Sequence, residues 1–77
     1  MARIEKFEPR NLEPTRIHDG VLCGYRAVRL RGQTVLQLET YGSRDRKMPD
    51  KVSQVIQLDE SGARELKRIL EASFPGI

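Results

Sequence analysis

Cysteine, histidine and tryptophan are scarce in this sequence of 77 residues. The single cysteine, Cys23, excludes a disulfide within the chain, and one histidine beside it cannot complete the four-ligand shell of a structural zinc site. A domain of this length buries only about 60% of the surface that its unfolded chain exposes, so its stability is marginal without help. We therefore expect no metal and no cofactor, and we expect ordinary packing or a second copy of the chain to stabilise the fold.

Long apolar runs are also absent. No stretch approaches the roughly 18 apolar residues of a membrane-spanning helix. Residues 1–6 alternate between charged and apolar side chains and contain no apolar signal-peptide core. Together with a free cysteine, these features predict a cytoplasmic protein. The composition, 38% hydrophobic and 32% charged, is typical of a folded protein, and we expect residues 1–77 to form one domain.

The chain lacks a recognisable catalytic set. His18 and Cys23 lie near one turn, and a Cys–His pair can form a nucleophile, but no third group orients them. A lone cysteine in a strand is more often a small buried hydrophobic residue. The spacing of a P-loop is missing, and no two carboxylates share a strand face. We therefore expect a binding protein rather than an enzyme.

Positive charge is concentrated in the middle of the chain. The net charge is +3, and residues 16–51 alone carry +4, whereas residues 1–15 are neutral and residues 52–77 carry −1. Most of the central cations are arginines, whose planar guanidinium groups suit the recognition of phosphate. The charge distribution therefore points to a small basic protein with an anionic partner.

Alternating apolar and polar residues predict β-strands over residues 3–7, 21–30, 34–41 and 52–58. The sequence Arg31-Gly32-Gln33 is predicted to be a short hairpin connection. Asp59 is a candidate helix N-cap with Glu60 in the first turn, and Pro75-Gly76 ends the helix. An apolar stripe at helical spacing consists of Ala63, Leu66, Ile69, Leu70 and Phe74.

This order predicts an α+β fold, a three- to four-stranded antiparallel sheet with one C-terminal helix packed on one face. Residues 1–20 would form an N-terminal strand and irregular segment, residues 21–58 the sheet, and residues 59–74 the helix. We expect the helix to cover Val28, Leu30, Leu36, Leu38, Ile56 and Leu58. The other face, open to water, a ligand or a second subunit, would carry Tyr25, Ala27, Arg29, Val35, Gln37, Glu39, Tyr41, Ser53, Val55 and Gln57.

The polar loop that begins at Gly42 has the chemistry of a phosphate-binding segment, with glycine, serine, arginine and lysine close together. An ordinary solvent-exposed loop can have the same composition. Gln54 would either bind a ligand or lie half-exposed at a strand end, and Tyr25 and Tyr41 would either stack on bases or pack at an edge. The candidate nucleic-acid contacts are Arg26, Arg29, Arg31, Tyr41, Ser43, Arg44, Arg46, Lys47, Lys51 and Gln54.

Residues 25–70 resemble the positive-cofactor-four family of transcriptional coactivators. The similar segments are the basic strand Tyr25–Arg29, the hairpin glycine in Arg31-Gly32-Gln33, the strand Val35–Tyr41, the basic loop Lys47–Lys51 with its proline, and Ile56-Gln57-Leu58. The chain differs from that family by the extra residues 52–55 and by the absence of an aromatic residue in the first half of the helix. The resemblance implies a dimer that binds single-stranded DNA with a curved sheet.

Two hypotheses follow. In the first, the chain is a nucleic-acid-binding module, and single-stranded DNA is favoured. In the second, it is a protein-interaction or assembly subunit that buries its open sheet face in a homodimer or a larger complex. Apolar residues expected on that face (Tyr25, Ala27, Val35 and Val55) favour the second hypothesis.

Overall fold

The computed structural model describes residues 1–13, 15–42 and 51–77, and it confirms the α+β fold. The described residues form one four-stranded sheet followed by a C-terminal helix, and no helix in these ranges is long and apolar enough to span a membrane. The elements are β1 (Ala2–Ile4), β2 (Cys23–Leu30), β3 (Gln33–Tyr41), β4 (Val52–Leu58) and α1 (Glu60–Ser73).

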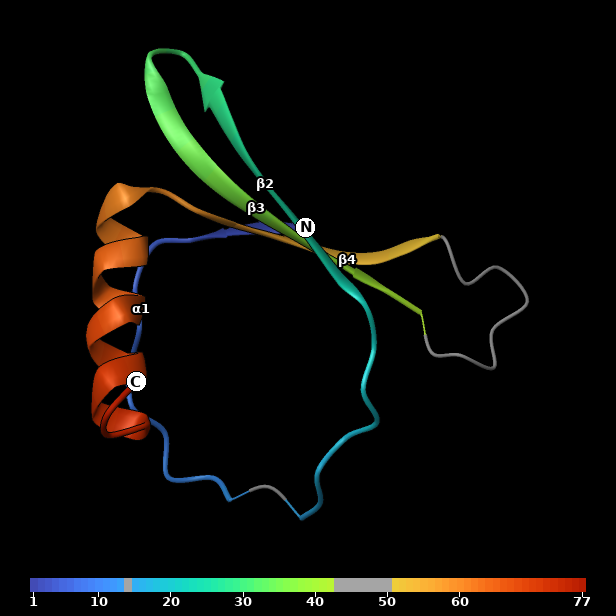
Figure 1. Cartoon of the computed structure of the whole chain (residues 1–77), viewed down its shortest axis with the longest axis vertical. Coiled ribbons are helices and arrows are strands. Elements are labelled where there is room, and N and C mark those ends of the chain that lie inside the picture. Colours follow the sequence, from blue (N-terminus) through green and yellow to red (C-terminus); the bar gives the residue numbers. More distant parts are fainter. Residues whose placement is uncertain (14, 43–50) are drawn as a thin grey trace.

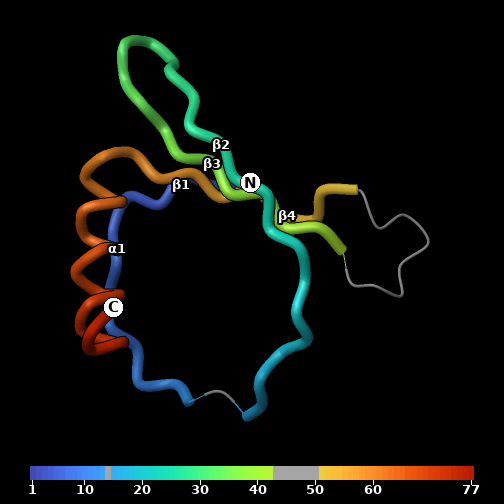
Figure 2. Tube along the Cα trace, viewed as in Figure 1, coloured from blue at the N-terminus to red at the C-terminus, as the bar shows by residue number. Residues whose placement is uncertain are grey.

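The strands lie in the order β1-β4-β3-β2. The β2–β3 and β3–β4 pairs are antiparallel, as expected, but β1 pairs parallel to β4, with Ala2 opposite Ile56 and Ile4 opposite Leu58. After β1 the chain leaves the sheet, runs a long way round and enters β2 at the other edge (Figure 2). The β2 edge is therefore formed by a strand of eight residues, and the β1 edge by a strand of only three.

The β2–β3 turn sets the register of the sheet. Arg31 and Gly32 both have positive φ, 50° and 79°, as in the type I′ turns of two-residue hairpins, and Leu30 therefore lies opposite Gln33. The sequence suggested the three-residue connection Arg31-Gly32-Gln33, which is one residue longer. A shift of one residue moves every side chain of a strand to the other face of the sheet.

The register corrects the predicted faces, because directly opposite residues share a face. Tyr25, Ala27 and Arg29 lie with Leu36 and Leu38, whereas Val28 and Leu30 lie on the other side. We call the first side the apolar face, formed chiefly by Ala2, Ile4, Tyr25, Ala27, Leu36, Leu38, Ile56 and Leu58. We call the second side the polar face, formed by Arg3, Gly24, Arg26, Val28, Leu30, Gln33, Val35, Gln37, Glu39, Val55 and Gln57.

The helix begins and ends where the sequence predicted. Asp59 caps it by accepting a hydrogen bond from the Gly62 amide (2.9 Å), and the Phe74 amide donates to the Leu70 carbonyl at the other end. The first turn lies against Leu58 and the end of β1. Gly62 is buried there, and a Cβ at that position would stand 3.3 Å from the Ile4 carbonyl oxygen, so this glycine permits a close approach.

The buried apolar core is small. Among the described residues, the buried hydrophobic side chains are Leu58 (2% exposed) and Val35 (7%). Beyond its first turn, α1 runs away from the sheet instead of lying across it (Figure 1). Most of its apolar stripe therefore stays accessible, and Phe74 is 60% exposed.

Candidate functional site

The polar face is organised around one carboxylate. Glu39 is only 7% exposed, and its Oε1 lies 3.0 Å from Arg26 Nε and accepts a hydrogen bond from Gln37 Nε2 (2.8 Å). Its Oε2 accepts from Arg26 Nη2 (3.2 Å) and, more weakly, from the Tyr41 hydroxyl (3.4 Å). The hydrogen bond from Gln37, with the charge of Arg26, lowers the pKa of the Glu39 carboxyl below its ordinary value of 4.5, although burial opposes the shift.

A row of polar side chains crosses the polar face from this cluster. Arg26, Gln37, Gln57 and Arg3 lie directly opposite one another on β2, β3, β4 and β1. Gln57 Nε2 donates to Gln37 Oε1 (2.9 Å), so both amides have fixed orientations. A shallow depression of about 380 Å³ beside the row is lined by Met1, Ala2, Arg3, Gln37, Val55 and Gln57. The row thus presents amide and guanidinium groups on an open surface.

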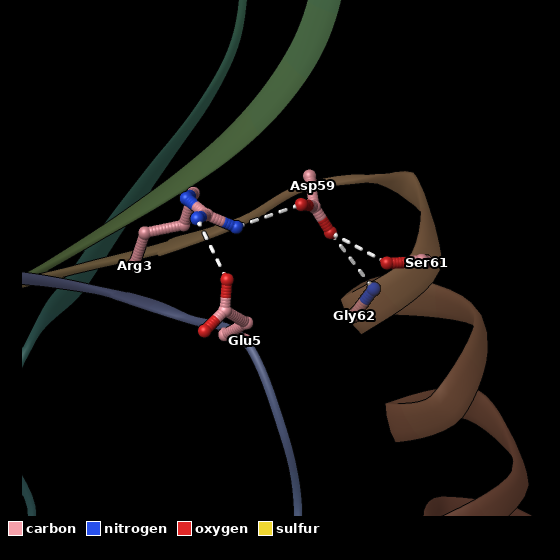
Figure 3. Close-up of polar contacts among 5 residues, drawn as sticks. All are labelled: Arg3, Glu5, Asp59, Ser61 and Gly62. Atoms are coloured by element: carbon pink, nitrogen blue, oxygen red, sulfur yellow. Dashed lines mark hydrogen bonds and ion pairs between the residues drawn. The ribbon is translucent and has the colours of Figure 1, made fainter.

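A second polar cluster joins β1 to the start of α1 (Figure 3). Arg3 Nη1 donates to Asp59 Oδ2 (2.9 Å), while Asp59 Oδ1 accepts from Ser61 Oγ (3.0 Å) and from the Gly62 amide. The backbone hydrogen bond from Gly62, with the hydrogen bond from the Ser61 hydroxyl and the charge of Arg3, lowers the pKa of the Asp59 carboxyl below its ordinary 3.8. This cluster attaches the parallel strand to the helix and is a structural feature.

The predicted contact residues fall into separate groups. Arg26 and Tyr41 are held by Glu39 on the polar face, whereas Arg29 and Arg31 are exposed at the hairpin end of the sheet. Lys51 and Gln54 are exposed at the opposite end, about 30 Å away along the nine residues of β3. Four predicted contacts lie outside the described residues: Ser43, Arg44, Arg46 and Lys47.

The two tyrosines do not form the joint platform that the sequence suggested. Tyr25 lies on the apolar face and is 80% exposed. Tyr41 lies over Gly24, where an added Cβ would stand 3.5 Å from the ring, and bonds to Glu39 on the polar face. Cys23, expected as a small buried residue, is exposed.

The cluster around Glu39 was missed from the sequence. Alternation placed Gln37, Glu39, Tyr41 and Gln57 on one face, and the register confirms that Gln37 lies opposite Gln57. Arg26 was expected on the other face, however, because a longer turn was assumed. A two-residue turn places Arg26 opposite Gln37, within reach of Glu39, so the turn length was the signal that could have found this ion pair.

The hairpin end carries cations without acidic partners. Within the described ranges, Arg29 and Arg31 form no ion pair, whereas Glu5, Glu8, Glu39, Asp59 and Glu60 all do. Arg29 also lines an open depression of about 460 Å³ between the hairpin and the start of α1, together with Gly32, Gln33, Thr34, Asp59, Glu60 and Ser61. Arg31, in the turn itself, does not line this depression.

Comparisons of the chain with protein-family models, with curated proteins and with solved structures found no match. The resemblance of residues 25–70 to the positive-cofactor-four family therefore stays a prediction.

Proposed function

We propose that this chain is a nucleic-acid-binding module that contacts phosphates through the β2–β3 hairpin. The observation that carries the proposal is the pair Arg29 and Arg31, which are exposed and form no ion pair with a described residue. Guanidinium groups of this kind donate charge-assisted hydrogen bonds to phosphate oxygens. The net charge of +3 acts in the same direction by attracting polyanions.

The polar face would take the bases. Arg26 is 60% exposed even though it is paired with Glu39, and the amides of Gln37 and Gln57 are held beside it. Side-chain amides can bond to the edges of unpaired bases, and an open sheet face suits a single strand better than a duplex. We therefore favour single-stranded DNA or RNA, with Lys51 and the predicted loop cations extending the contact to the other end of the sheet. A cytoplasmic location is part of this proposal.

Fluorescence anisotropy with labelled single-stranded DNA, duplex DNA and RNA of equal length, measured over a series of salt concentrations, tests the proposal. Each lost phosphate contact on a single strand should reduce the slope of log K against log salt by about 0.7, so Arg29→Ala with Arg31→Ala should reduce it by about 1.4. We expect Arg31→Ala to weaken binding more than Arg29→Ala, because Arg29 lines the same depression as Asp59 and Glu60 and Arg31 does not.

The matched control is the double variant Lys67→Ala with Arg68→Ala, which removes the same charge from exposed positions of α1. It should lower affinity slightly and leave the slope nearly unchanged. Equal effects of the two double variants would show that only net charge matters. Absence of binding to all three nucleic acids at low salt would refute the proposal. The triple variant Arg44→Ala, Arg46→Ala, Lys47→Ala then measures the share of the predicted loop contacts.

A further inference from the structure

The chain exposes more surface than a folded monomer of its size normally does. Its accessible surface is 7269 Å², whereas a monomer of 8.8 kDa typically exposes about 4,800 Å². Its radius of gyration is 14.6 Å, compared with about 11.5 Å for a compact domain of this length. An excess of about 2,500 Å² per chain is on the scale of the surface that stable homodimers bury.

The exposed apolar surface lies on two elements that adjoin each other. The apolar stripe of α1 and the apolar face meet at Leu58, which touches the first turn of the helix. On the sheet, Tyr25 is 80% exposed and Leu36, Leu38 and Ile56 are only partly covered. On α1, Ile69 and Leu70 are each 38% exposed and Phe74 is 60% exposed. A patch of this kind on a small protein indicates a contact surface.

We infer that a second copy of this chain covers this surface, forming a twofold dimer in which α1 of each copy packs on the apolar face of the other. The two parts of the surface are complementary in kind, because a helix stripe needs an apolar sheet face and each copy leaves part of both exposed. A twofold axis satisfies both needs twice with one interface. In the described strands, Arg29 is the one charged residue on the apolar face, so a polyanion is a poor occupant.

The expected dimer contact thereby moves to the other side of the sheet. From the sequence, the mixed face with Val35 and Val55 was the candidate surface for a homodimer. Those residues lie on the polar face, and Val35 is already buried within one chain. A dimer through the apolar face leaves Arg31 and the Arg26–Gln37–Gln57 row accessible, whereas Arg29 lies at the hairpin end of the apolar face itself. The dimer and the proposed ligand therefore meet at Arg29 and otherwise use different surfaces. The inference does not depend on nucleic-acid binding.

Sedimentation equilibrium of the whole chain tests the inference. We expect a mass twice the 8.8 kDa of one chain at micromolar concentration. Tyr25→Asp combined with Leu70→Asp should weaken association by about 100-fold or more, since it places a charge on each of the two contacting parts. Leu30→Asp is the matched control, because Leu30 is 55% exposed on the polar face, and it should leave the mass unchanged.

At a protein concentration of roughly 0.2 mM, a wild-type mass of one chain would overturn the inference, because mass action favours the dimer at high concentration. Dissociation caused by the single substitution Leu30→Asp would overturn it as well. Because the double variant could unfold, the thermal midpoint of the wild type provides a measurement without substitutions. For a dimer that unfolds as it dissociates, the midpoint rises with protein concentration, and for a monomer it is constant. A constant midpoint would mean that the chain covers the surface itself, for example with residues 5–13 and 15–22.

Discussion

The two faces of the sheet differ in how far one chain completes them. On the polar face, Glu39 has several hydrogen-bond donors from its own chain, and within the described residues no buried side-chain nitrogen or oxygen lacks a partner. On the apolar face, Tyr25 is 80% exposed and Leu58 is the one described residue that is nearly inaccessible, and the adjoining stripe of α1 is also partly exposed. Polar groups can be satisfied locally by one or two neighbours, whereas apolar area requires a large opposing surface.

This difference suggests a division of roles. A face with fixed amide and guanidinium groups can recognise a ligand without rearranging, because its side chains are already held. A face with exposed apolar area contributes stability only when something covers it. We therefore expect substitutions on the apolar face to affect folding and association, and substitutions on the polar face to affect ligand recognition and pH dependence.

Replacing Leu58 should have the largest effect. Leu58 is 2% exposed and lies where the apolar face, β1 and α1 meet. Leu58→Ala should lower the free energy of unfolding by about 2–5 kcal/mol, enough to unfold a domain of marginal stability. Urea denaturation followed by circular dichroism measures the loss. Leu12→Ala, at a side chain that is 92% exposed, should change stability by less than about 0.5 kcal/mol. A loss below about 1 kcal/mol for Leu58→Ala would contradict the burial of this side chain.

A substitution in the hairpin turn tests the separation of the two faces. Gly32 has φ of 79°, and no atom lies within 4 Å of a Cβ placed on it, so Gly32→Ala acts on backbone conformation alone. We expect it to cost about 1–2 kcal/mol, because a residue with a Cβ is disfavoured in the left-handed region. Gly20→Ala is the control, since Gly20 also has open space and no positive φ. Equal stabilities for the two variants would argue against the type I′ turn and against the register that it sets.

The pH dependence of stability should report the carboxylates of the two polar clusters. The pKa of Glu39 is lowered in the folded state from an ordinary 4.5, so its contribution is fully present above that value and is lost as the pH falls through the lowered pKa. Asp59 acts in the same direction, from an ordinary 3.8. Thermal melts should therefore show a midpoint that declines on acidification below about pH 4.5.

Single substitutions separate the two carboxylates. Glu39→Gln should remove part of the decline of the thermal midpoint on acidification. The difference in midpoint between this variant and the wild type should therefore shrink as the pH falls. Asp59→Asn should remove the remaining part at lower pH, because the ordinary pKa of Asp59 is the lower of the two. The range from pH 5 to pH 3 spans roughly the ordinary pKa values of the two carboxyls. If the thermal midpoint of the wild type were constant over this range, the ionised state of Glu39 would not contribute to stability.

The candidate site could be predicted only in part. The exposed cations Arg29 and Arg31 were found from charge and from the turn beside them, and both are local features. The interaction of Arg26 and Tyr41 with Glu39 was missed, because it depends on which residues face each other across two strands. Without the correct pairing, the sequence places Arg26 on the wrong face and predicts a nucleic-acid contact without its ion pair to Glu39.

The elements follow from the sequence alone: three of the four strands to within two residues, the Asp59 cap and the end of α1. These depend on alternation, helical spacing and capping groups, which act over a few neighbouring residues. The tertiary structure decided the parallel pairing of β1, the side of the sheet on which each β2 residue lies, and the exposure of the α1 stripe. A strand pattern repeats every two residues, so it groups side chains by face but leaves open which face of the neighbouring strand they join. The length of the turn, two residues and not three, decides this pairing, and it places Arg26 on the polar face and Tyr25 on the apolar face.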